Sequence, residues 1–382
     1  MTYTYVATCL FGLERFVGEE IDALGYKRIE TIDGRVTFEG DITAIARCNM
    51  WLRCAERLYI KMGEFPARSF TELFDGVKAL PWESWIGKDD AFPVKGHSVR
   101  SALTSIPDCQ SIVKKAVVDR LSQEYGISWF TEEGVKYQID FFILNDKATL
   151  MIDTSGEPLY KRGYRLSTGE APLRETIACA IAKISRPRSG IIFWDPFCGS
   201  GTIPTEAALL MTKTAPGSFR SFAAEEFYDV DPRVWKDARD EAHDLQDLSA
   251  DFEAYASDID PKMAEITKAN LNSAGMDKHV KVFVKDAKEI SAGGMRGSII
   301  CNPPYGERLM TPYQARKLYA DIGKAFDKLT NWQIYVLTSE DRFEQYYGKK
   351  ADKIRRLYNG MLKCNLYQYY KPSQEKGMSK KA

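Results

Sequence analysis

The sequence has few of the residues that form metal sites or disulfide frameworks. Its 382 residues include only three histidines, His97, His243 and His279, which lie far apart, and its eight cysteines form no C-x-x-C pair. A structural zinc site needs four such ligands at close spacing, so no metal is expected. Reduced, buried thiols are the expected state of the cysteines, as in other proteins of the cytosol.

The chain also lacks the features of secreted and membrane proteins. Its first residues, Met-Thr-Tyr-Thr-Tyr-Val, do not place a basic segment before an apolar stretch, as a secretory signal would. No apolar run approaches the roughly 20 residues that a membrane-spanning helix requires. We therefore expect a cytoplasmic protein with no membrane association.

A net charge is absent as well, but the balance conceals an asymmetry. The chain contains 53 Lys and Arg residues and 53 Asp and Glu residues. Residues 1–160 hold 18 basic and 24 acidic residues, whereas the remainder carries a net charge of +6. A neutral total therefore does not exclude an acidic partner such as RNA, since the second half can present a basic face.

The hydrophobic periodicity predicts two kinds of region. Residues 1–63 alternate short strands and amphipathic helices, which is typical of a ferredoxin-like α+β unit. A second α+β module follows over residues 64–160. From residue 161 onward, strands and helices alternate as in a doubly wound, mostly parallel sheet. The predicted strands of that sheet are 190–195, 252–258, 280–285, 296–302 and 332–338.

Two further features belong to the predicted C-terminal domain. Asn359-Gly360 lies between two alternating segments, and this dipeptide is typical of a tight hairpin turn. An antiparallel hairpin is therefore expected to close the sheet. Residues 216–250 exceed an ordinary connection between strand and helix, and their charged, amphipathic pattern predicts a helical insertion.

A glycine-rich loop follows the first predicted strand of the C-terminal domain. Its two glycines let the backbone approach a ligand closely, and the helix N-terminus behind it favours an anion. A dinucleotide fingerprint requires a third glycine where Pro204 stands, and a Walker loop requires a lysine that is missing. A tight turn that binds nothing is the plainer alternative. The loop consists of Asp195, Pro196, Phe197, Cys198, Gly199, Ser200, Gly201 and Thr202.

Acidic residues follow the next two predicted strands. Asp258, followed by Ile259, stands where a carboxylate typically binds ribose hydroxyls. Asp260 precedes a proline and is expected to cap a helix. Asp286, followed by Ala287, could accept a hydrogen bond from a nucleobase amine or merely begin a turn.

The fourth predicted strand ends in Asn302-Pro303-Pro304-Tyr305-Gly306. The two prolines stiffen the turn and remove backbone donors, which leaves carbonyl groups and the Asn302 amide oxygen free to accept hydrogen bonds. The ring of Tyr305 offers a surface for stacking. Together these groups suit a planar exocyclic amine on a base that has left its helix. A rigid turn without a ligand is the alternative.

In this order, the three motifs resemble those of class I S-adenosylmethionine-dependent methyltransferases that modify amino groups. The segments 159–165 (LYKRGYR), 171–176 (APLRET) and 9–14 (CLFGLE) resemble the corresponding parts of THUMP-domain RNA methyltransferases. The resemblance extends over nearly the whole chain and is strongest to bacterial 23S rRNA guanine-N2 methyltransferases. It implies a Rossmann-like class I methyltransferase domain after a ferredoxin-like unit and a THUMP module.

The resemblance also implies roles for individual residues. Asp195, Phe197, Gly199 and Gly201 would line the methionine and ribose parts of S-adenosyl-L-methionine. Asp258 would hold the ribose hydroxyls, and Asp286 would lie near the adenine. Glu175 and Thr176 would close over the cofactor. Asn302, Pro303 and Tyr305 would hold the target base, with Pro304 in the same turn. A cysteine nucleophile is disfavoured, because Cys198 and Cys301 are expected to be packing residues.

The implied activity is methyl transfer to the exocyclic N2 amine of a guanine in 23S rRNA. The alternatives are a tRNA guanine-N2 methyltransferase, an adenine-N6 RNA methyltransferase and a non-catalytic RNA-binding assembly factor. Basic residues in 161–188 and 342–382, the latter with Tyr346, Tyr347 and Tyr358, are expected to neutralise RNA phosphates, a solvated surface being the alternative. The RNA face of the THUMP module is expected within residues 92–120.

Overall fold

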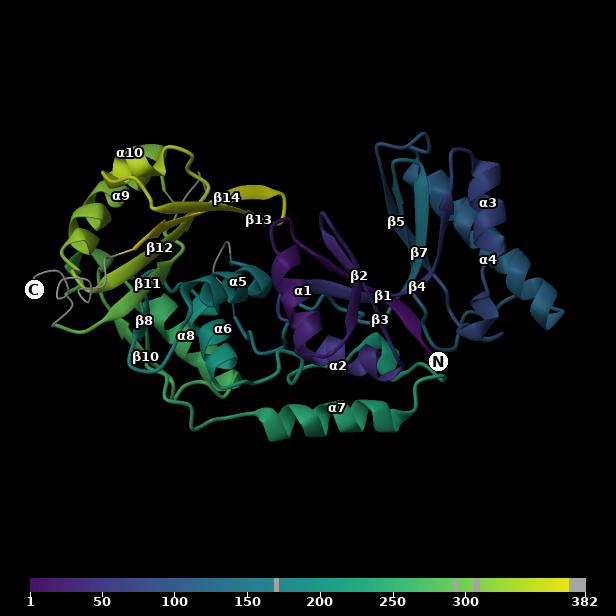
Figure 1. Cartoon of the computed structure of the whole chain (residues 1–382), viewed down its shortest axis with the longest axis horizontal. Coiled ribbons are helices and arrows are strands. Elements are labelled where there is room, and N and C mark those ends of the chain that lie inside the picture. The colour runs from purple at the N-terminus through teal and green to yellow at the C-terminus, as the bar shows by residue number, and fades with distance from the viewer. Residues whose placement is uncertain (168–171, 292–293, 305–309, 371–382) are drawn as a thin grey trace, which may run out of the picture. The chain divides into compact units, whose positions relative to one another are not determined.

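The structure is a computed structural model that describes residues 1–167, 172–291, 294–304 and 310–370. Its chain divides into two compact units, and each unit takes segments that are distant in the sequence (Figure 1). Unit 1 comprises Met1–Cys9, Glu14–Leu159 and Arg220–Asp244, and unit 2 comprises Leu10–Leu13, Tyr160–Phe219 and the chain from Leu245 onward.

Unit 1 is built on one seven-stranded sheet with the order β2-β3-β1-β4-β7-β6-β5. Strand β4 pairs with β1 on one side and with β7 on the other, so the ferredoxin-like and THUMP modules share a single sheet. Its elements are β1 (Tyr3–Cys9), α1 (Glu14–Ala23), β2 (Lys27–Ile32), β3 (Arg35–Gly40), α2 (Thr43–Trp51), β4 (Ala55–Pro66), α3 (Phe70–Lys78), η1 (Trp82–Ser84), β5 (Val94–Val99), α4 (Ile106–Tyr125), β6 (Ile139–Leu144) and β7 (Lys147–Asp153).

The core of unit 1 follows from the strand register. Tyr5, Ile60, Ile152 and Ile139 lie opposite one another on neighbouring strands, so their side chains share one face, and all four are buried. Helices α1 and α2 pack on the ferredoxin-like strands, and α3 and α4 pack on the THUMP strands. The expected boundary at residue 63 falls inside β4, which continues to Pro66.

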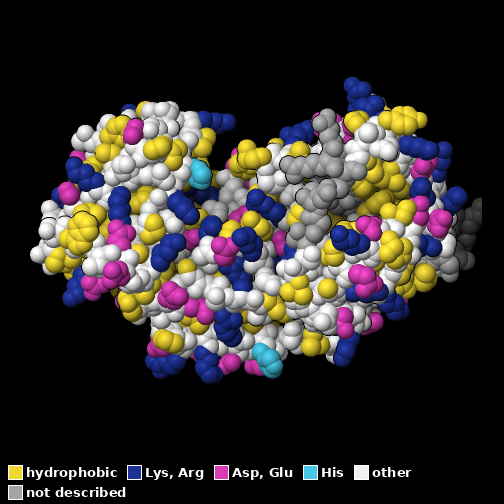
Figure 2. All heavy atoms as spheres, turned by 180° about the vertical axis from the view of Figure 1, so that it is seen from behind, with side chains coloured by type: hydrophobic (Ala, Val, Ile, Leu, Met, Phe, Trp, Pro, Cys, Tyr) yellow, Lys and Arg dark blue, Asp and Glu magenta, His cyan; other side chains and the backbone are white. Residues whose placement is uncertain are grey.

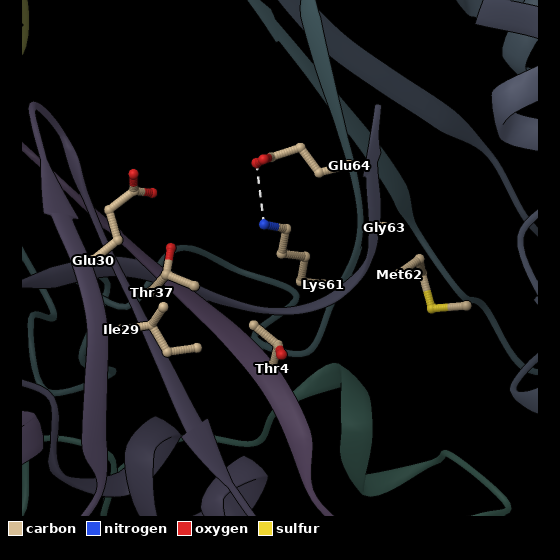
Figure 3. A pocket seen from close by; sticks show the side chains of 8 residues that line it. All are labelled: Thr4, Ile29, Glu30, Thr37, Lys61, Met62, Gly63 and Glu64. Carbon is tan, nitrogen blue, oxygen red and sulfur yellow. Dashed lines mark hydrogen bonds and ion pairs between the residues drawn. The ribbon is translucent and has the colours of Figure 1, made fainter. Parts of the chain in front are cut away.

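The other face of this sheet carries a hollow of about 520 Å³. Figure 3 shows the hydroxyl-bearing Thr4 and Thr37 and the carboxylate of Glu30 around it, with Lys61 reaching toward Glu64. The Lys61 ammonium lies 3.0 Å from the Glu64 carboxylate, and Lys147 pairs with the same carboxylate. Burial of the Glu64 carboxylate raises its pKa, but the hydrogen bonds and charges of Lys147 and Lys61 have the larger combined effect and lower the pKa to about 2.

The predicted helical insertion is present as η2 (Ala223–Glu225) and α7 (Pro232–Leu245), but it belongs to unit 1. Arg47 on α2 makes two hydrogen bonds of 2.7 Å with Glu241 on α7. The Phe227 ring stacks on Tyr137 with 4.3 Å between the ring centroids. Unit 1 is therefore completed by a segment that the sequence analysis places inside the C-terminal domain, residues 161–382.

Phe227→Ala is expected to lower the free energy of unfolding of unit 1 by about 3–5 kcal/mol, because it empties a buried aromatic site. Urea denaturation followed by tryptophan fluorescence measures this change. Tyr228→Ala is the matched control, since the neighbouring Tyr228 is 72% exposed. Equal stability of the two variants would show that the insertion does not contribute to the core of unit 1.

Unit 2 contains a second seven-stranded sheet with the order β10-β9-β8-β11-β12-β14-β13. Strands β10, β9, β8, β11 and β12 run parallel, and β14 pairs antiparallel with β12 and β13. Its elements are α5 (Glu175–Ser185), β8 (Ile192–Asp195), α6 (Thr202–Met211), β9 (Ala254–Asp258), α8 (Pro261–Ser273), β10 (Val280–Val284), η3 (Ala287–Glu289), β11 (Gly297–Cys301), α9 (Pro312–Asp327), β12 (Trp332–Thr338), α10 (Phe343–Tyr347), β13 (Lys353–Asn359) and β14 (Leu362–Tyr369).

Helices cover both faces of this sheet, as a doubly wound fold requires. One layer joins Trp194, Ile299 and Val336 of the strands to Tyr319 of α9 and Phe343 of α10. Helices α5, α6 and α8 pack together on the opposite side (Figure 1). The predicted fold class, including the C-terminal antiparallel hairpin, is confirmed. None of the described helices combines the length and the apolar character that crossing a bilayer would require.

Candidate active site

The three sequence motifs meet at one edge of the sheet in unit 2. Strand β8 pairs in parallel with β9 on one side and with β11 on the other. Parallel neighbours end at the same edge, and ligands of open α/β sheets bind beyond these carboxyl ends. The glycine loop follows β8, Asp258 ends β9, and Asn302 follows β11, so the fold places all three side by side.

The glycine loop has a backbone that only glycine adopts easily. Gly199 and Gly201 have φ values of +53° and +82°. A Cβ built on Gly201 would lie 2.8 Å from Cγ2 of Thr267 on α8, so the loop and that helix are in close contact. A Cβ built on Gly199 would meet no atom within 4 Å. Gly199 therefore leaves open space above the loop, into which a ligand can approach the backbone.

Two residues of α8 that belong to none of the sequence motifs, Thr267 and Asn270, hold the loop in place. The Thr267 hydroxyl donates a 2.8 Å hydrogen bond to the Gly199 carbonyl, and the Asn270 amide donates a 2.9 Å hydrogen bond to the Ser200 carbonyl. Both side chains are buried. The sequence feature that could have indicated them is their spacing: two polar residues three positions apart lie on the inward side of an amphipathic helix.

Asp195 is almost fully buried at the end of β8. Its Oδ1 accepts a 3.0 Å hydrogen bond from the Phe197 amide, but its Oδ2 is buried and finds no hydrogen-bond partner in the described part of the chain. Burial raises the pKa of Asp195 well above its usual range, the Phe197 amide opposes this, and the nearby Asp258 carboxylate adds to it. A buried acceptor of this kind requires a donor, and a ligand ammonium group would supply one.

Asp258 fixes the geometry between β9 and the loop. Its Oδ2 accepts a 3.0 Å hydrogen bond from the Gly199 amide, and its Oδ1 accepts one of 3.0 Å from the Asp260 amide. Burial raises the pKa of Asp258, and these backbone amides oppose the rise. Asp260 caps α8 by accepting from the Lys262 amide, as predicted.

The adenine end of the expected cofactor site is less enclosed. The Ile259 side chain, directly after Asp258, is 64% exposed although it is apolar. Asp286 caps η3 through the Lys288 amide and pairs with the Lys288 ammonium at 3.0 Å, and Ala287 is buried. An exposed isoleucine beside a carboxylate can contact a planar apolar ring while the acidic group accepts a hydrogen bond from an amine.

The clamp motif lies beside Asp195 because β11 neighbours β8. The Oδ1 atom of Asn302 is buried and has no hydrogen-bond partner among the residues that the structure describes. Pro303 is buried, and the Pro304 carbonyl accepts a 3.1 Å hydrogen bond from the Tyr319 hydroxyl on α9. The turn is thereby held on one side by the core. Tyr305 and Gly306 lie outside the described residues.

Glu175 and Thr176 begin α5 and are buried. Arg165 pairs with Glu175 at 2.8 Å and also donates to the hydroxyl of Thr202, the first residue of α6. Burial, opposed by Arg165, raises the pKa of Glu175 to about 7. Arg165 therefore links Glu175 to the residue that ends the glycine loop, and the closing of Glu175 and Thr176 over the cofactor stays a prediction.

A second buried ion pair joins the same segment to α6. Arg162 contacts Glu206 at 3.4 Å, and the Tyr164 hydroxyl donates to the same carboxylate. Both ions are buried, so the pairing is required to offset their desolvation. Arg162 and Arg165 lie in the segment predicted to form a basic RNA surface, and for these two residues that prediction was wrong, because both face buried carboxylates.

Other residues that were predicted to contact RNA make contacts within the protein. Tyr347 is a core residue stacked on Phe343. In the THUMP module, Lys114 pairs with Glu132 at 2.6 Å, and Arg120 pairs with Glu83. Figure 2 shows Lys and Arg side chains interspersed with Asp and Glu over the face that it presents. The expected RNA face within residues 92–120 therefore stays a prediction, with fewer available cations than the sequence suggests.

The residues at this edge fit S-adenosylmethionine. The unpartnered Asp195 oxygen suits the methionine ammonium group, Gly199 leaves space for the ligand, and Asp258 and Ile259 suit the ribose and adenine. Within the described ranges, His, Cys, Asp and Glu side chains nowhere gather in a group of three that could hold a metal ion. All eight cysteines lie within the described residues, where they are buried and not joined in disulfides.

Comparison with known proteins gives the same domain order. The chain matches the RlmL ferredoxin-like domain over residues 4–59, the THUMP domain over residues 67–153 and the RMKL-like methyltransferase domain over residues 162–368. It is 41% identical to YpsC of Bacillus subtilis (strain 168), which is described as an RNA methyltransferase, over 96% of each chain.

Two further relatives extend the comparison. The chain is 30% identical to the ribosomal RNA large subunit methyltransferase K/L of Desulfotalea psychrophila over 95% of its own length. It spans about half of that relative, 52%. The crystal structure of the methyltransferase SMU.472 complexed with SAH superposes with a TM-score of 0.90 at 41% identity, covering 97% of this chain and 99% of the other. The chain therefore belongs to the RMKL-like methyltransferase family and is an S-adenosylmethionine-dependent enzyme with ferredoxin-like and THUMP domains.

Proposed function

We propose that this enzyme methylates the exocyclic N2 amine of a guanine in RNA, with 23S rRNA as the substrate. One observation supports the proposal: two buried oxygens have no hydrogen-bond partner among the described residues, on Asp195 at the end of β8 and on Asn302 directly after the adjacent parallel strand β11. The first suits the cofactor, and the second suits an amine N–H of the target. The THUMP domain and the names of the relatives support RNA, and ribosomal RNA in particular, as the substrate.

The chemistry requires positioning more than acid–base strength. S-adenosylmethionine supplies a methyl group on a sulfonium sulfur, which needs no activating base. Asn302 would accept a hydrogen bond from the amine and orient its lone pair toward the methyl group. The same acceptor would stabilise the positive charge that develops on the nitrogen. Pro303 and Pro304 would keep the acceptor in place, because their backbone torsions are restricted.

The substrate can be identified in a strain that lacks this gene. Nucleosides from purified 23S rRNA and from tRNA are separated and quantified by mass spectrometry. We expect one N2-methylguanosine to be missing from 23S rRNA and to return when the wild-type gene is restored. Loss of N2-methylguanosine from tRNA, or of N6-methyladenosine from either RNA, would identify one of the alternative substrates. Unchanged methylation in both RNAs would overturn the proposal.

The restored strain needs an inactive control that keeps the fold. Asn302→Ala is suitable, because the side chain is half-buried at the end of a strand and the substitution leaves the Pro303-Pro304 turn intact. If Asn302→Ala restored methylation as well as the wild type, the residue would not be the amine acceptor. If neither gene restored it, the missing modification would have another cause.

A further inference from the structure

The β13–β14 hairpin carries exposed apolar and basic side chains for which the site described above has no use. Strands β12 and β13 both run antiparallel to β14, so they are parallel to each other. The turn after Asn359 therefore lies at the carboxyl edge of the sheet, the same edge as the glycine loop and Asn302. We name the group formed by Phe11, Arg174, Arg356, Tyr358, Met361 and Leu362 the hairpin platform.

Two aromatic rings form the centre of the hairpin platform. Phe11 belongs to the short segment that unit 2 takes from the N-terminal part of the chain, and its side chain is 53% exposed. Its ring meets the ring of Tyr358 edge to face, with 5.8 Å between the centroids. Met361 at the turn is 99% exposed, and Leu362 beside it is also exposed.

The segment that carries Phe11 is fixed against the hairpin. Gly12 has a φ of +91°, and a Cβ at this position would lie 2.9 Å from the Arg356 carbonyl oxygen. Glycine is therefore required here, both for the backbone conformation and for the close approach. The position of the exposed Phe11 ring beside Tyr358 is thus a consequence of backbone packing.

The hairpin region is also rich in basic residues. Arg356 is exposed, and residues 342–370 hold seven Lys and Arg residues against two acidic residues, with Lys349 and Lys363 paired to Asp327 and Asp341. The Arg174 guanidinium lies 4.6 Å from the Tyr160 ring centroid and 3.6 Å from the position of a Cβ on Gly360 in the turn. Glu175, the residue after Arg174, pairs with Arg165, and Arg165 donates a hydrogen bond to Thr202 at the end of the glycine loop. These contacts connect the platform with the glycine loop.

Edge strands often carry charged side chains that prevent pairing with another chain, which explains the cations of β13. It does not explain the exposed Phe11 ring beside the half-buried Tyr358, or the exposed Met361 side chain. Aromatic rings among cations at the edge of a groove are the pattern that binds single-stranded nucleic acid, since bases stack on the rings and phosphates meet the cations. A target base must leave its helix to reach Asn302, so its neighbours in the strand are unpaired and need a surface.

We propose that the hairpin platform stacks the unpaired nucleotides that flank the target base. This inference rests on the proposed function, because it takes RNA as the substrate of the site at the same edge. The chemistry favours single-stranded RNA over a protein partner, because the paired rings of Phe11 and Tyr358 lie at a hairpin that also carries the exposed Arg356.

Binding of a fluorescein-labelled 12-nucleotide uridine oligomer, measured by fluorescence anisotropy, tests the proposal. Phe11→Ala and Tyr358→Ala should each raise the Kd by about five- to hundred-fold, as expected when one stacked base is lost. Tyr358→Phe should restore binding, because it keeps the ring. Tyr313→Ala is the control, since Tyr313 on α9 is also exposed, at 76%. Unchanged Kd values in both Ala variants would overturn the proposal, as would an equal loss in Tyr313→Ala.

A second measurement separates this inference from the proposed function. S-adenosylmethionine affinity, measured by calorimetry, should be the same in all four variants. On unmodified 23S rRNA transcribed in vitro, kcat/KM should fall in parallel with oligomer affinity. If the wild type binds the cofactor and the oligomer but does not methylate the transcript, the proposed substrate is wrong and the platform stands. If the transcript is methylated equally by wild type and Ala variants, the platform is wrong and the proposed function stands.

Discussion

Asn302→Ala is expected to lower kcat for methyl transfer by about 100- to 1,000-fold, the usual effect of removing one preorganised polar group that acts on developing charge. The Oδ1 atom of Asn302 is buried without a partner, so it is available to the amine and makes no hydrogen bond within the described protein. The Kd for S-adenosylmethionine should stay nearly unchanged. Single-turnover methylation of 23S rRNA and calorimetry measure the two quantities.

Asn272→Ala provides the control for this experiment. Asn272 lies on α8, is exposed and is remote from the strand end that carries Asn302, so its removal should leave both kcat and cofactor affinity unchanged. An Asn302 variant that loses cofactor affinity as strongly as it loses turnover would show that Asn302 supports the cofactor site. A variant with normal turnover would show that the amine is held by other groups.

Gly199→Leu is expected to abolish detectable S-adenosylmethionine binding while the protein stays folded. A side chain at Gly199 would enter the open space above the loop, where the ligand must approach the backbone. The positive φ of +53° adds strain of about 1–2 kcal/mol. Calorimetry with the cofactor measures the binding, and a thermal melt measures the strain.

Gly275→Leu is the control that separates backbone strain from obstruction of the cofactor site. Gly275 also has a positive φ, +66°, and a Cβ there would meet nothing within 4 Å, but it lies in the turn after α8. Both variants should lose a similar amount of thermal stability, whereas only Gly199→Leu should lose the cofactor. Normal cofactor binding by Gly199→Leu would contradict the position that we assign to the ligand.

The candidate site could be proposed from the sequence because its motifs are local, and the roles of its residues stay predictions. A strand followed by a glycine loop, an acidic residue after the next strand and Asn-Pro-Pro after a third strand each lie within a few residues. Parallel strands end at one edge, so the fold class itself brings these motifs together. The hairpin was predictable for the same reason, because Asn359-Gly360 is a local turn signal, although Asn359 pairs with Leu362 and the turn itself consists of Gly360 and Met361.

Elements without a local pattern were missed. Strand β2 is an edge strand with exposed residues on both faces, so it shows no alternation of apolar and polar residues. Helix α5 is buried on nearly all sides, so its apolar residues do not recur at helical spacing on one face. The residue Tyr347 was expected to contact RNA, but Phe343 and Tyr369 pack against it and make it part of the core.

By itself, the sequence determined the order of modules, the doubly wound fold and the three motifs of the site, because short-range spacing encodes them. The tertiary structure alone decided which charges are available and which segments complete each unit. Arg162 and Arg165 face buried carboxylates, and residues 220–244 complete unit 1 although they lie within the predicted methyltransferase domain. These outcomes depend on contacts between residues distant in the chain. Burial drives such contacts, and local periodicity does not record them.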